Sequence, residues 1–91
     1  MITIFKYAIV GANNKIELPK GAEVLSVASQ NHKIFMWAKI DTEAKTEVRN
    51  FEVFGTGHEM TQDIGIDYTF IGTAHMISGL VFHVFEYKFA K

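Results

Sequence analysis

The chain has 91 residues, of which 48% are hydrophobic and 13% aromatic, and its formal net charge is −1. This length fits one domain, residues 1–91, and the hydrophobic content excludes a disordered segment. The balanced charge, with Arg49 as the sole arginine, argues against general nucleic-acid binding, which relies on a basic excess and on arginine forks.

The sequence also limits the cell compartment. It contains no cysteine, which excludes disulfides and thiolate metal sites. Lys6 interrupts the apolar run of the first residues, so we expect no signal peptide. No stretch approaches the roughly 18 apolar residues of a membrane span. We therefore expect a cytoplasmic protein without a membrane partner.

Strand signals dominate the start of the chain. Residues 2–10 are rich in β-branched and aromatic side chains, and the turn formers at 11–14 predict a reversal of the chain. Residues 15–18 predict a short second strand. Residues 18–21 have proline second and glycine last, a pattern that predicts a type I turn.

The next two predicted strands form a hairpin. Residues 22–30 and 33–40 flank Asn31 and His32, and asparagine is one of the few residues that tolerate a positive φ in a tight turn. The polar stretch 41–47 predicts a connection.

The second half of the sequence predicts three further strands. Residues 48–54 alternate, so that Arg49 shares one side with Phe51. Residues 68–76 and 80–89 predict the closing strands. No segment has sustained helical spacing. We therefore predict an all-β fold, a compact antiparallel sandwich or barrel of about seven short strands.

The strand predicted at 80–89 has apolar residues on both faces. Phe82 and Val84 point to one side, and Val81 and Phe85 to the other. Two explanations stay open, because an antiparallel sheet normally has one polar face. Either the strand is central and covered on both sides, or its second face contacts another copy of the protein. A homo-oligomer is therefore one of our expectations.

Gly55, Thr56, Gly57 and His58 are the first candidate site. Glycines allow a tight turn that exposes N–H groups to an anion or small ligand. The loop lacks the lysine and spacing of a phosphate-binding loop. The alternative explanation of the glycines is a strand-end loop that needs positive φ. We predict ligand contacts at these four residues.

The histidines and acids indicate no catalytic or metal site. The four histidines have no zinc-binding spacing, and His83 shares a face with apolar residues, which favours a hydrogen-bonded histidine. His58 and Glu59 are neighbours and would point to opposite sides of a strand. We expect no catalytic residue, no metal, no cofactor and no enzymatic activity.

Trp37 and Arg49 complete the predicted ligand-binding set. If Met36 and Ala38 fill the core, then Phe35, Trp37 and Lys39 form an exposed aromatic stripe that could stack on a base or anchor an interface. The opposite register buries Trp37.

Arg49 is on the strand that leads into the glycine loop. Its planar fork could hold an anionic ligand bound at that loop. The alternative for Arg49 is an ion pair with Glu47 or with an acid on an adjacent strand.

Several stretches together resemble a family of small proteins encoded mainly by bacteriophages. The resemblance covers roughly residues 4–86 and is carried by these stretches: "IFKYAIV", "IELPKGAEVLSVASQ", "MWAKID", "TEVRNFEVFGTGH", "DYTFIGT" and "GLVFHVFE". This family is a domain of unknown function, so the resemblance implies a setting and no mechanism.

The phage setting leads to two hypotheses, by analogy. The first is a homo-oligomeric, non-enzymatic binding protein in the host cytoplasm. It would antagonise host defence by sequestering a small, anionic, nucleotide-like ligand or by blocking a host defence protein. The second is a structural or assembly accessory protein of the virion.

Overall fold

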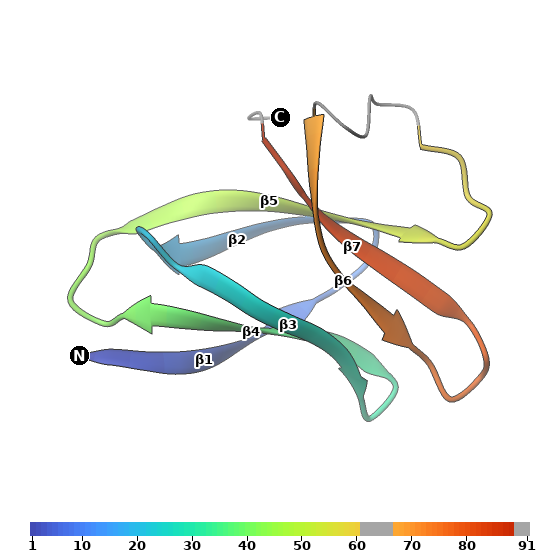
Figure 1. Ribbon diagram of the computed structural model, residues 1–91, viewed down its shortest axis with the longest axis horizontal. Helices are drawn as coiled ribbons and strands as arrows, with labels where there is room; N and C mark the ends of the chain where they lie inside the picture. Colours follow the sequence, from blue (N-terminus) through green and yellow to red (C-terminus); the bar gives the residue numbers. More distant parts are fainter. Residues whose placement is uncertain (61–66, 89–91) are drawn as a thin grey trace.

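The computed structural model describes residues 1–60 and 67–88, and these form seven antiparallel strands in two sheets (Figure 1). The strands are β1 (Ile2–Ile9), β2 (Asn13–Pro19), β3 (Glu23–Gln30), β4 (Lys33–Asp41), β5 (Thr46–Gly55), β6 (Tyr68–His75) and β7 (Val81–Tyr87). One sheet has the order β1-β4-β3 and the other the order β2-β5-β7-β6. The predicted all-β fold is confirmed.

The core lies between the two sheets. Met36 and Ala38 of β4 are fully buried, and from the other sheet Phe51 of β5 and Val84 of β7 are buried against them. The alternation predicted for β5 follows from this packing, because successive residues of a strand face opposite sides. Arg49 shares the inward side with Phe51.

The hairpin between β3 and β4 agrees with the sequence. Asn31 has φ 52° and His32 has φ 64°, and two positive φ values in succession are the requirement of a type I′ turn. The two strands pair directly across this turn, from Gln30 opposite Lys33 onward.

The turn formers at residues 11–14 reverse the direction of the chain, as Figure 1 shows, although β1 and β2 do not pair with each other. β1 pairs with β4, whereas β2 pairs with β5 in the other sheet. Gly11 has φ 69°, and the Asn14 side chain accepts a hydrogen bond from the Val10 N–H at 2.8 Å. The turn formers therefore carry the chain from one sheet to the other.

The proline turn is displaced by one residue from its predicted position. The Ala22 N–H donates to the Pro19 carbonyl at 3.1 Å, so the turn spans residues 19–22. Gly21 is then the third residue, with φ 82°. A positive φ at the third position is typical of a type II turn and not of type I.

The two sheets approach most closely where β3 faces β6. A side chain at Gly72 would have its Cβ 3.0 Å from Cβ of Val27. The Ser29 hydroxyl also donates to the His75 carbonyl at 2.6 Å. This side of the sandwich is closed, and β1 lies at the far edge of its sheet.

β7 is an internal strand between β5 and β6, so both of its edges are paired. Its core face is the one that carries Val84, which is fully buried, whereas Phe85 and Tyr87 on the outer face are half-buried. The predicted strand at 80–89 begins one residue later, and Phe89 lies outside the described residues, as does most of the segment 59–67.

Candidate functional site

The glycine loop begins where β5 ends, and each of its glycines has a separate structural cause. The His58 N–H donates to the Gly55 carbonyl at 3.0 Å, and the Gly55 N–H donates to His58 Nδ1 at 3.2 Å. Gly57 has φ 87°, a conformation that glycine adopts without strain. A Cβ on Gly55 would be 2.6 Å from His58 Cε1. Gly57 therefore permits the turn, and Gly55 leaves space for the imidazole.

The hydrogen bond from the Gly55 N–H also determines which nitrogen of the neutral His58 ring carries the proton. Because a backbone N–H donates to Nδ1, Nδ1 is the unprotonated nitrogen and the neutral ring carries its hydrogen on Nε2. Nε2 is thus the donor that this ring can offer to a ligand.

The loop N–H groups are largely used within the protein. Those of Gly55 and His58 bond within the loop, and that of Thr56 donates to the Val81 carbonyl at 3.1 Å. The predicted anion cradle of exposed N–H groups is therefore not what the geometry offers. The imidazole is the polar group of this loop that is suited to a ligand.

Thr56 connects the loop to His83 of β7. Its hydroxyl is 2.8 Å from His83 Nε2, and the Thr73 hydroxyl of β6 is 3.2 Å from Nδ1 of the same ring. Both ring nitrogens of His83 thus have hydroxyl partners, as a hydrogen-bonded histidine requires. This arrangement holds the loop against β7 and β6.

Two adjoining cavities flank the His58 ring, and we call them together the end cleft. Their volumes are about 460 Å³ and 310 Å³, and Gly55, His58 and Phe82 line both. The first is bounded by the connection at residues 79–82, and the second reaches Ile9. Volumes of this order are typical of small-molecule sites. In Figure 1 the end of β5 and the start of β7 lie on the same side of the molecule.

Arg49 is not part of the end cleft. Its Nε and Nη2 donate to the two carboxylate oxygens of Glu86 on β7, at 2.6 and 2.7 Å, and its Nη1 donates to the Ala22 carbonyl at 2.6 Å. The hydrogen bonds and charge of Glu86 raise the pKa of Arg49. Six residues of extended strand separate Arg49 from Gly55, roughly 20 Å. The structure therefore shows the ion pair with an adjacent strand and does not bring Arg49 to the loop.

Trp37 lies at a third place, on the outer face of the sheet formed by β1, β4 and β3. Met36 and Ala38 fill the core, so the register that exposes the stripe is the one observed. The ring centroids of Phe35 and Trp37 are 6.4 Å apart, and Lys6 Nζ is 4.6 Å from the Phe35 centroid. The six predicted ligand contacts thus divide among three regions, and the four loop residues alone share one.

One polar pair on the outer face of β5 and β6 was not predicted. Glu52 is only 6% exposed, and the hydroxyl of Tyr68 donates to its carboxylate at 2.9 Å. Burial and the neighbouring carboxylate raise the pKa of Tyr68 to about 12. Phe54 and Phe85 pack edge-to-face on Tyr68. The two partners are 16 residues apart in sequence. No local sequence pattern therefore shows that Tyr68 lies beside Glu52.

The part of the chain that the structure describes contains no group of three or more His, Asp or Glu side chains placed to hold a metal ion. Within the same residues, no helix is long and apolar enough to cross a membrane.

The fold and the end cleft define a class, a small all-β sandwich domain with an apolar cleft at a strand end. The model of a family described as a domain of unknown function (DUF7352) matches residues 1–91, and the chain belongs to this family. No curated protein and no solved structure matches the chain.

Proposed function

We propose that this protein is a non-enzymatic binding protein whose ligand site is the end cleft. The observation that carries the proposal is the position of the His58 ring, which lies against Gly55 between two cavities of small-molecule size. Its Nδ1 is held by a backbone N–H, so the ring is oriented in advance of binding. Pre-oriented polar groups in an apolar cleft are typical of ligand sites.

The lining favours a flat ligand with a polar edge. Phe82 and the His58 imidazole line both cavities, and aromatic rings pack well against other flat rings. His58 Nε2–H can donate to an acceptor on the ligand. A nucleotide-like molecule has both features, because its base is flat and its phosphates accept hydrogen bonds.

The biological role proposed with this site is sequestration. Encoded by a phage, such a protein would antagonise host defence by removing a nucleotide signal from the host cytoplasm. Blocking a host defence protein would have the same result. Both roles come from the resemblance to phage proteins, and the cleft supports the small-ligand form.

Titration calorimetry with a panel of mononucleotides and cyclic nucleotides tests the site. We expect the His58→Ala variant to bind at least about tenfold more weakly, the equivalent of one lost hydrogen bond and some ring contact. Gly55→Ala should weaken binding similarly, because its Cβ would displace the ring.

Trp37→Ala is the matched control, because Trp37 lies on the outer face of the other sheet. It should leave the affinity unchanged. Equal affinity of wild type and His58→Ala for a bound nucleotide would exclude the end cleft as the site.

A second candidate function, a structural or assembly accessory of the virion, is supported by a different observation. Many large apolar side chains are exposed, among them Ile77 at 82% and Leu80 at 60%. Exposed apolar patches of this kind are typical of protein contacts. Mass spectrometry of purified phage particles should then detect the protein, and its absence from the particles would exclude this candidate.

A further inference from the structure

β1 is an exposed edge strand with apolar residues on both faces. Among the strands that the structure describes, its neighbour in the sheet is β4 alone. Ile2 and Ile4 on the outer face are 63% and 55% exposed, and Phe5 on the inner face is 47% exposed. A long apolar edge of this kind is a template for pairing with another strand.

The other three sheet edges have the features that normally prevent such pairing. β2 contains Lys15, Glu17 and a terminal proline. β3 and β6 each contain a bulge, and they face each other on the closed side of the sandwich. An edge strand is protected from pairing with another strand by charged side chains, prolines and bulges, or by packing against another element. β1 has regular pairing along its whole length and no proline.

The single charge on β1 is directed away from the free edge. Lys6 Nζ donates to the Gln30 side chain on β3 at 3.0 Å and lies over the Phe35 ring. The lysine side chain therefore extends across β4 toward the opposite edge of the sheet. It does not shield the edge that β1 exposes.

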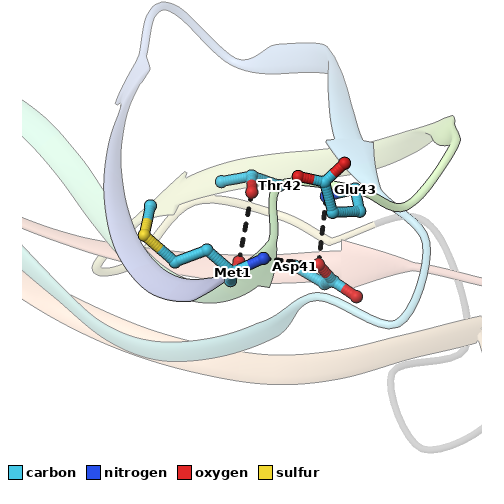
Figure 2. Close-up of polar contacts among 4 residues, drawn as sticks. All are labelled: Met1, Asp41, Thr42 and Glu43. Carbon is cyan, nitrogen blue, oxygen red and sulfur yellow. Dashed lines mark hydrogen bonds and ion pairs between the residues drawn. The ribbon is translucent and has the colours of Figure 1, made fainter.

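The hydrogen bonds at the start of β1 show which backbone groups face outward. The Thr42 N–H donates to the Met1 carbonyl at 2.9 Å, which makes Met1 and Thr42 a hydrogen-bonded pair. Figure 2 shows the same two residues, where the Thr42 hydroxyl also donates to the Met1 carbonyl. Hydrogen-bonded pairs alternate along an antiparallel ladder. Odd residues of β1 thus bond to β4, and even residues aim N–H and C=O at the free edge. The even residues are Ile2, Ile4, Lys6 and Ala8.

We propose that β1 pairs antiparallel with β1 of a second copy about a two-fold axis at Phe5. Ile4 then lies opposite Lys6 of the other copy, and Ile2 opposite Ala8. All the outward groups of both strands are used, in about eight hydrogen bonds. The two sheets join into one continuous sheet.

Charge and side-chain packing select this register over its neighbours. A shift of one residue in the two-fold axis toward Lys6 would place two lysines directly opposite, which is unfavourable. A shift toward Ile4 would leave the Ala8 groups unpaired. The axis at Phe5 instead brings the two half-exposed phenyl rings together on the inner face, in a non-hydrogen-bonded pair where side chains are closest. This inference does not depend on what the end cleft binds.

The absence of native cysteine allows a direct test by single cysteine variants. In a non-hydrogen-bonded pair the Cα atoms are about 4.5 Å apart, within disulfide range. We expect full-length Phe5→Cys to form a covalent dimer on mild oxidation.

Thr3→Cys is the matched control, because it lies on the same face of β1. Its two copies would be four residues out of register, roughly 13 Å, and should not cross-link. Equal cross-linking of both variants would overturn the register.

Sedimentation of the unmodified protein over a concentration series tests the pairing itself. We expect a shift from one to two copies of the 10.3 kDa chain. Ile4→Pro removes an outward N–H and no bond to β4, so it should weaken the dimer at least roughly 30-fold, as for two lost hydrogen bonds. The proposal would be overturned if the protein stayed monomeric at every concentration and Phe5→Cys formed no cross-link. The free edge of β1 would then be a site for a strand of a different protein.

Discussion

At the level of single residues, the partners of Arg49 decide whether its guanidinium can contact a ligand. Arg49 is held by both oxygens of Glu86 and by the Ala22 carbonyl. The sequence does not show whether the Arg49 guanidinium is free to bind a ligand or is paired with an acid. The partner lies 37 residues away on β7, and the pairing of β5 with β7 determines whether the fork is available to a ligand.

The Arg49–Glu86 pair predicts a stability change. Arg49→Met should lower the free energy of unfolding by about 2 kcal/mol, because it leaves a largely buried carboxylate without its guanidinium. The double variant with Glu86→Leu should cost less than the sum of the two single variants. Urea denaturation measures both. A loss below about 0.5 kcal/mol for Arg49→Met would show that the pair contributes little.

The raised pKa of Tyr68 predicts that the stability of the folded protein depends on pH in the alkaline range. Its pKa is about 12 in the folded protein against 10.0 for the free group. The folded state therefore holds the phenol proton more tightly, and the associated stability is complete below pH 10 and is lost as the pH rises toward 12.

The control for this prediction is Tyr68→Phe, which has no proton to lose. The urea midpoint of the wild type should decrease more steeply over this pH range than that of Tyr68→Phe. Parallel curves for the two proteins would show that burial and the bond to Glu52 do not raise the pKa of Tyr68 in the folded state.

At the scale of strands and turns, local patterns were the reliable guide. The strands follow from alternation and from turn residues, and the Asn31–His32 turn has the positive φ values that its sequence predicts. The sequence does not show which strands pair with one another. The turn formers at 11–14 indicate a reversal of the chain, but they do not show that the turn joins two sheets, because pairing depends on residues distant along the chain.

The type I′ turn between β3 and β4 predicts how a substitution at His32 changes the stability of the protein. His32 has φ 64°, and glycine adopts this conformation without the cost of a Cβ. His32→Gly should therefore raise the free energy of unfolding by about 0.5 kcal/mol. Lys33→Gly, one residue further and inside β4, should lower it by a similar amount. Thermal denaturation compares the two, and a loss of stability for His32→Gly would contradict the turn assignment.

At the scale of the whole molecule, the sandwich separates residues that looked like one site in sequence. The core register puts Trp37 on the outer face of one sheet, and the length of β5 separates Arg49 from His58. The loop residues remain together, because their spacing is local. The Phe82 wall of the end cleft arises from the pairing of β5 with β7, which no local motif reveals.

The proposed function requires that the end cleft hold a small ligand through His58. Native mass spectrometry of the protein purified gently from cells, beside the His58→Ala variant, tests this requirement. We expect extra mass of nucleotide size on the wild type and its loss in the variant. Bare protein in both spectra, with no mass retained after addition of the nucleotide panel, would contradict it.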